Sequence, residues 1–227
     1  MANVDKVKIL VVGDSGVGKT SLVHLICHNE PTNNPGWTIG CSVDVKLHEY
    51  KAGTAAEKTF FIELWDIGGC TSHQDCRSMF YTNVHGIILV HDLTNRKSQQ
   101  NLQCWLGEVL RKENKISGGN GFDLDSEQFV GNQLPLLVIG TKADQTETIR
   151  DKNRQSSVAE EFGADQFDLD NYSVKYLAPG STNAVKLSRF FDKVIERRYY
   201  SRESQAPTLQ SHSSPQLGRR VKNAHVD

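Results

Sequence analysis

The sequence has no apolar stretch long enough to cross a membrane. No run approaches the roughly 20 apolar residues that a membrane helix needs, and the start, Met-Ala-Asn-Val-Asp-Lys, lacks the apolar segment of a signal peptide. Lysine and arginine (26) nearly balance aspartate and glutamate (27), so there is no basic excess to indicate a nucleic-acid partner. We expect a soluble protein with no nucleic-acid partner and no direct membrane anchor.

Cysteine is scarce, and its spacing argues against two common uses. The five cysteines are an odd number, and no two stand in a CxxC pair. We therefore expect neither a disulfide framework nor a zinc site, and a reducing, cytoplasmic environment fits better. The 227 residues, of which 37% are hydrophobic, suffice for one globular domain.

Apolar runs alternate with amphipathic stretches along the first 200 residues. Short β-branched runs predict buried strands, and apolar residues at helical spacing predict helices. The expected strands are 7–12, 41–48, 59–65, 86–92, 136–140 and 167–169, with 41–48 and 59–65 forming a hairpin; the expected helices are 20–29, 102–110, 157–162 and 182–195. This order predicts an α/β fold with a six-stranded, mostly parallel sheet, one antiparallel edge strand and helices on both faces.

Two segments fall outside this alternation. Residues 116–133 are long, polar and glycine-rich for a helix-to-strand connection, and residues 201–227 are rich in Ser, Gln and Arg without apolar periodicity. We expect one domain over 1–200 with an inserted loop at about 116–133, followed by a disordered tail over 201–227. Apolar residues in the loop (Phe122, Leu124 and Phe129) either fold back on the domain or form a partner or homodimer contact.

A phosphate-binding motif, Gly13-x4-Gly18-Lys19-Thr20, follows the first strand and opens the first helix. Glycines let backbone N–H groups approach phosphate oxygens, and the helix N-terminus adds partial positive charge. Lys19 would reach the β- and γ-phosphates, and the Thr20 hydroxyl would ligate Mg²⁺. A glycine turn without a ligand is disfavoured, because the spaced motif residues and the flanking strand and helix all fit a phosphate-binding loop. The predicted contacts are Ser15, Gly16, Val17, Gly18, Lys19, Thr20 and Ser21.

A second motif, Asp66-Ile67-Gly68-Gly69, ends the returning strand of the hairpin. An acid at a strand end can hold Mg²⁺ through a water molecule, and the N–H of Gly69 can reach a γ-phosphate. Taken alone, the motif also fits a β-turn with a solvated aspartate. Its occurrence beside a phosphate loop favours the P-loop NTPase fold.

A third motif, Thr141-Lys142-Ala143-Asp144, follows another apolar strand. The Asp144 carboxylate can accept hydrogen bonds from guanine N1–H and N2–H₂, and adenine has no matching donors. Lys142 can lay its aliphatic stem over the base. A charged surface loop would have the same composition, but the position after a strand favours guanine recognition.

The order of these motifs resembles the Ras superfamily of small GTPases, and most closely its Rab branch. The similarity runs from about residue 4 to residue 199. It rests on Gly13–Thr20, Thr38-Ile39-Gly40, Asp66–Gly69, Thr141–Asp144, His85–Ile88 and His91–Asn95. The amino-acid sequences of 37–45 and 181–193 are also similar to those of one Rab-like subfamily.

The resemblance implies a GTP- and GDP-binding switch with Mg²⁺ held by Thr20, Thr38 and Asp66. The loops around Thr38 and Gly69 would close on GTP, relax after hydrolysis and bind effector or regulator proteins. The base-contacting loop is not the usual Ser-Ala-Lys. By Rab spacing it falls on Asp170 and Asn171, and the alternative, 178–181, better resembles a helix start.

Two departures from the family pattern concern turnover and nucleotide retention. Cys70 stands where active members place a glutamine that orients the attacking water, so we expect at most slow hydrolysis. His73 is a candidate substitute, against the simpler reading of a solvated loop histidine. Thr141 replaces the usual asparagine, and the base-contacting loop departs from Ser-Ala-Lys. Together these differences imply weaker binding of the base and fast nucleotide exchange.

A third departure concerns membranes and partners. No cysteine follows Cys104, and the start lacks Met-Gly, so we expect no lipid anchor. The resemblance adds a homodimer and work on other small GTPases, or on their lipidation or chaperone factors, as expected partners. The leading function is thus a GTP-binding switch, the alternative is a nucleotide-stabilised scaffold that rarely cycles, and a third class is a small P-loop kinase or ATPase.

Overall fold

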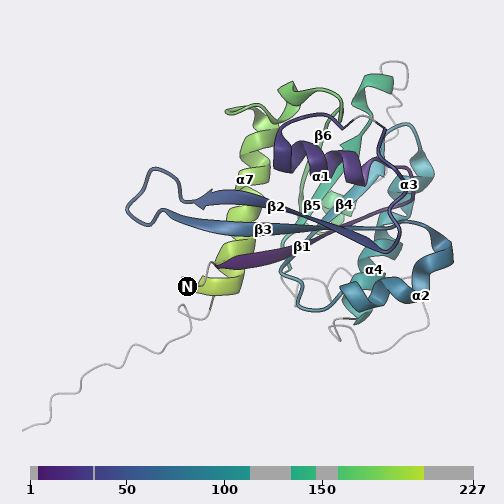
Figure 1. Cartoon of the computed structure of the whole chain (residues 1–227), viewed down its shortest axis with the longest axis horizontal. Coiled ribbons are helices and arrows are strands. Elements are labelled where there is room, and N and C mark those ends of the chain that lie inside the picture. The colour runs from purple at the N-terminus through teal and green to yellow at the C-terminus, as the bar shows by residue number, and fades with distance from the viewer. Residues whose placement is uncertain (1–4, 33, 113–133, 147–157, 202–227) are drawn as a thin grey trace, which may run out of the picture.

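The computed structural model describes residues 5–32, 34–112, 134–146 and 158–201, and the inserted loop expected at 116–133 and the expected tail beyond Ser201 lie outside them. Its centre is a six-stranded sheet in the order β2-β3-β1-β4-β5-β6 (Figure 1). All neighbouring pairs are parallel except β2 and β3. The strands are β1 (Lys6–Val12), β2 (Cys41–Tyr50), β3 (Lys58–Ile67), β4 (Gly86–Asp92), β5 (Leu136–Thr141) and β6 (Asp165–Asp168). The predicted sheet is confirmed.

Helices cover both faces of the sheet, as the sequence predicts. One hydrophobic cluster packs α1 (Lys19–His28) and α7 (Thr182–Ile195) on one face, and a second packs α4 (Leu102–Lys112) and α6 (Val158–Glu161) on the other. Two short helices, α2 (Gln74–Arg77) and α3 (Arg96–Gln100), follow β3 and β4. Shorter helical turns span Thr71–His73, Ser78–Phe80, Ala143–Gln145, Val174–Leu177 and Glu196–Tyr200. None of the described helices is both long and apolar enough to span a membrane.

The edge strand β2 alternates as predicted, but its apolar side chains face outward. Val43, Val45 and Leu47 are 44%, 50% and 62% exposed, whereas His48 and Tyr50 are buried. His48 packs edge-on against Phe191 of α7, so the inward face of β2 is filled by aromatic and polar side chains.

The carboxyl ends of the parallel strands meet at one edge of the sheet. There β1 leads into the glycine loop before α1, β3 carries Asp66 near its end, and β5 ends at Thr141. The loop after β6 reaches the same edge, because Leu169 N–H donates to Gly140 O at 2.8 Å. In open α/β sheets ligands bind in the crevice outside these strand ends.

Candidate nucleotide-binding site

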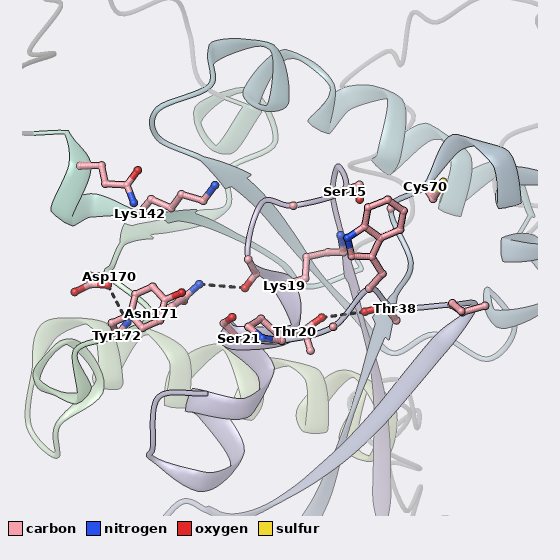
Figure 2. A pocket seen from close by; sticks show the side chains of 18 of the residues that line it. Ser15, Lys19, Thr20, Ser21, Thr38, Cys70, Lys142, Asp170, Asn171 and Tyr172 are labelled. Carbon is pink, nitrogen blue, oxygen red and sulfur yellow. Dashed lines mark hydrogen bonds between the residues drawn. The ribbon is translucent and has the colours of Figure 1, made fainter. Parts of the chain in front are cut away.

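A cavity of about 790 Å³ opens at this edge. It is lined from five segments of the chain: 15–21, 35–39, 69–73, 142–145 and 170–172. All the predicted site residues line it except Val17, Ala143 and Asp66, and Asp66 is hydrogen-bonded to the lining residues Thr20 and Thr38. Figure 2 shows Lys142 and Asp170–Tyr172 at one end, Thr38 and Cys70 at the other, and Lys19 between them.

Two glycines allow close backbone contacts of the phosphate loop, with β4 at Gly13 and with the loop after β3 at Gly69. A Cβ on Gly13 would lie 2.1 Å from the carbonyl oxygen of Val90. A Cβ on Gly69 would lie 2.5 Å from Ser15 N and 2.7 Å from Gly13 O. Since real Cβ atoms do not approach backbone so closely, both positions require glycine.

Lys19 lies inside the phosphate loop and is only 6% exposed. Its Nζ donates to the carbonyl oxygens of Gly13 and Asp14, each at 2.8 Å. Burial lowers the pKa of Lys19 to about 8. A polyanion in the cavity would favour the charged ammonium and supply it with further acceptors.

Three oxygen-bearing side chains converge beside Lys19. Thr20 Oγ1 lies 2.5 Å from Asp66 Oδ2 and 2.9 Å from Thr38 Oγ1, and Thr38 Oγ1 donates to Asp66 Oδ2 at 3.0 Å. Asp66 is 1% exposed, and its Oδ1 has no hydrogen-bond partner among the described residues. Burial raises the pKa of Asp66 above its ordinary value. Because Mg²⁺ takes hard oxygen ligands, these three residues and the orphaned carboxylate oxygen fit a magnesium ion.

Lys142 stands at the other end of the cavity in a left-handed backbone conformation, with φ of 60°. Its Nζ is 2.5 Å from Asp92 Oδ2 at the end of β4, an ion pair that the motif analysis did not anticipate. The same carboxylate accepts the N–H of Thr94 at 2.8 Å. Lys142 donating to Asp92 lowers the pKa of that carboxyl despite partial burial. The ion pair thereby fixes the end of the Lys142 side chain, and Lys142 and Asp144 both line the cavity.

Both base-side motifs are tied to the phosphate loop. Thr141 is fully buried, and its Oγ1 is 2.6 Å from the carbonyl oxygen of Val17. Asn171 Nδ2 donates to the carbonyl oxygen of Gly18 at 3.1 Å. Residues 170–172, and not the alternative 178–181, line the cavity; Ser181 instead caps α7 by accepting from Ala184 N–H.

A network behind the cavity joins the phosphate loop to the segment after Gly69. The Asp14 carboxylate accepts Trp105 Nε1–H and Asn101 Nδ2–H, both at 2.8 Å. The Arg77 guanidinium lies 4.2 Å from the centre of a Trp105 ring and donates to Glu108 at 3.2 Å. These contacts could not be predicted from the sequence, because their partners lie far apart, as do Asp14 and Trp105 at 91 residues, and follow no motif spacing.

Cys70 and His73 both line the phosphate end of the cavity. Hydrogen bonds from Ser72 lower the pKa of the Cys70 thiol. Burial raises the pKa of Cys27 and of Cys41 to about 11.

These pKa values predict an order of alkylation. At equal pH the thiolate fraction of Cys70 therefore exceeds that of Cys27 or Cys41, and the lower nucleophilicity of a weaker base offsets only part of this advantage in rate. Limiting iodoacetamide at pH 7.5, followed by peptide mass spectrometry, should find Cys70 modified faster than the partly buried Cys27 and Cys41. In urea-unfolded protein the three rates should converge, and modification of Cys27 or Cys41 first in the folded protein would refute the assignment.

Comparisons with known proteins agree with this geometry. Residues 8–199 match the Ras family. The chain is 54% identical to Rab-like protein 3 of Mus musculus over 237 residues and 53% identical to that of Homo sapiens over 238 residues, each match covering 100% of both chains. It is also 34% identical to the small GTPase LIP1 of Arabidopsis thaliana over 87% of this chain and 64% of that one.

The family match over most of the chain and the full-length similarity to named relatives both indicate a small GTPase. The resemblance drawn from the motifs is therefore confirmed. The chain belongs to the Ras family of small GTPases and is a Rab-like member of it.

Proposed function

We propose that this chain binds GTP and GDP with Mg²⁺ in the cavity at the strand ends and acts as a regulatory switch. The observation that supports this proposal most directly is the order in which three kinds of chemical group lie along one cavity. Oxygen ligands from Thr20, Thr38 and Asp66 lie at one end, the Lys19 ammonium follows, and Lys142 and Asp144 lie at the other end. That order matches metal, phosphates and base in a nucleotide.

The magnesium ion would be held by Thr20, Thr38 and Asp66, and when bound it would neutralise charge on the β- and γ-phosphates. Thr38 comes from the loop after α1, whereas Thr20 lies in the first turn of α1 itself. A contact that depends on the γ-phosphate would therefore order the Thr38 loop in one nucleotide state only, which is the basis of a switch.

Slow hydrolysis is part of the proposal. Cys70 lines the cavity directly after Gly69, where a residue could position an attacking water. A thiol is a weak donor and a weak acceptor, so it cannot fix that water as an amide does. His73 also lines the cavity, and its replacement by alanine tests whether it substitutes for the missing amide.

Partner proteins would bind around Thr38. Its neighbours Trp37 and Ile39 are 91% and 80% exposed, and Met79 after α2 is 63% exposed. Exposed apolar side chains on segments that respond to nucleotide are suited to a state-dependent interface. Self-association, and a role in the lipid modification or delivery of other small GTPases, remain predictions from the family resemblance.

Titration calorimetry with Mg·GTP, Mg·GDP and Mg·ATP tests the nucleotide assignment. Guanine nucleotides should bind, and ATP at equal concentration should not compete. ATP competing equally would favour a P-loop kinase or ATPase.

The alternative, a nucleotide-stabilised scaffold, is favoured by Cys70. It predicts equal partner binding by GTP- and GDP-loaded protein, whereas a switch predicts a preference for one state. Pull-down of a partner with protein loaded with each nucleotide separates the two.

A further inference from the structure

The side chain of Asn171 joins the loop after β6 to the phosphate loop (Figure 2). Asn171 lines the cavity yet is only 6% exposed, and its Nδ2 donates to the carbonyl oxygen of Gly18 at 3.1 Å. A Cβ on Gly18 would lie 2.6 Å from that nitrogen, so a side chain there would displace the amide. The loop after β6 is therefore bonded to the residue directly before Lys19.

A second side chain bonds to the neighbouring peptide of the phosphate loop. Thr141 is fully buried, and its Oγ1 is 2.6 Å from the carbonyl oxygen of Val17. The loops after β5 and β6 thus each hold one of two consecutive carbonyl groups of the phosphate loop. Of these two side chains, Asn171 lines the cavity and Thr141 does not.

The loops after β5 and β6 are also bonded to each other. Leu169 N–H donates to Gly140 O at 2.8 Å, and Leu169 O accepts the N–H of Ala143 at 3.2 Å. Together with the bonds of Thr141 and Asn171, these contacts connect three loops in a closed triangle. Removing the Asn171 amide would open one side of that triangle.

A nucleotide in this cavity would be held at both ends. In the proposed function Lys19 takes the phosphates, whereas Lys142 and Asp144 take the base. Two binding groups reinforce each other only when the link between them keeps the separation that the ligand requires. A link that is already fixed in the free protein also removes the entropy cost of ordering a loose loop on binding.

We propose that Asn171 is a positioning residue whose carboxamide fixes the base-binding loops on the phosphate loop and so slows nucleotide release. The inference rests on the proposed function, because it requires a ligand that spans both ends of the cavity. Buried polar atoms are normally paired, yet Asn171 Oδ1 has no hydrogen-bond partner among the described residues. An apolar side chain would suit a position that only filled space. The bond to Gly18 also offsets the weaker base binding that Thr141 implies.

The test compares dissociation of tritiated GDP from wild type, Asn171→Leu and Asn171→Ala, each in Mg²⁺ with excess unlabelled GDP. Leucine keeps the volume of the side chain but cannot donate, so both variants should release GDP about three- to tenfold faster, the effect of losing one hydrogen bond. Asn183→Leu is the matched control and should leave the rate unchanged. It also removes an amide bond to a backbone carbonyl, that of Asp168 at 3.0 Å, but lies outside the cavity lining.

Inorganic pyrophosphate separates positioning from damage to the phosphate loop. It reaches the phosphate end alone, so titration calorimetry of nucleotide-free protein with Mg·pyrophosphate should give the same Kd for wild type and Asn171→Leu within about twofold. A leucine variant that releases GDP at the wild-type rate would overturn the proposal. So would a leucine variant that loses as much affinity for pyrophosphate as for GDP. If wild type binds pyrophosphate but no guanine nucleotide, the proposed function fails instead.

Discussion

An Asp144→Asn variant is expected to lose GTP affinity by about 10²- to 10⁴-fold and to gain affinity for xanthosine triphosphate. In the proposed site the Asp144 carboxylate would accept two hydrogen bonds from guanine N1–H and N2–H₂, and each charge-assisted bond contributes about 1.5–3 kcal/mol. An asparagine amide keeps one acceptor but turns a donor toward N2. Xanthine carries a carbonyl oxygen at that position, so the amide suits it.

Competition against labelled GDP measures both affinities in one series. Asp75→Asn, the same charge change on an exposed residue of α2 outside the cavity lining, is the control and should bind both nucleotides as wild type does. Unchanged GTP affinity in Asp144→Asn would place the base elsewhere. Lost affinity for both nucleotides with a loss of folded structure would indicate damage to the loop, and Asp144→Glu then provides the second test because it keeps the acceptors.

A Cys70→Gln variant is expected to hydrolyse bound GTP on the order of 10²-fold faster than wild type, the lower range for a group that positions and handles a proton. An amide offers a donor and an acceptor on one plane, so it can hold water against the γ-phosphate where a thiol cannot. Single-turnover hydrolysis of preloaded Mg·GTP measures the change.

Cys76→Gln is the matched control for this substitution. It makes the same change six residues on, at an exposed position that does not line the cavity, and should leave hydrolysis unchanged. Equal rates in wild type and Cys70→Gln would show that Cys70 does not limit turnover. A further loss on His73→Ala in the wild-type background would assign the residual activity to that histidine.

The fold could be predicted from sequence because its signals are local. The runs at Val7–Val12 and Leu136–Gly140 are rich in β-branched residues and are largely buried. Period-two alternation predicted that the β2 segment is a strand. The facing of β2 could not be predicted in the same way. Alternation defines two faces, but which one meets α7 depends on packing between segments about 140 residues apart, as His48 and Asp192 illustrate.

The site residues that belong to a sequence motif could be predicted, whereas the contacts that the fold makes between distant segments could not. Motif spacing placed Asp66 near the end of a strand and Lys19 and Asp144 in the segments that follow two other strands, and the structure brings those strand ends together. Asn171 is predicted to contact the base through its backbone N–H, and the structure adds a side-chain bond to Gly18 O that the sequence did not predict. Neither this bond nor the ion pair of Lys142 with Asp92 follows a fixed spacing.

The nucleotide carried by the purified protein tests the central claim most directly. Protein purified in Mg²⁺ is denatured, and the released nucleotide is identified by anion-exchange chromatography, with Lys19→Ala as the reference that lacks the phosphate-binding ammonium. The account predicts guanine nucleotide, with GTP a substantial part of it, from wild type and far less from Lys19→Ala. Adenine nucleotide, or nucleotide-free protein that also takes up no added Mg·GTP, would contradict it.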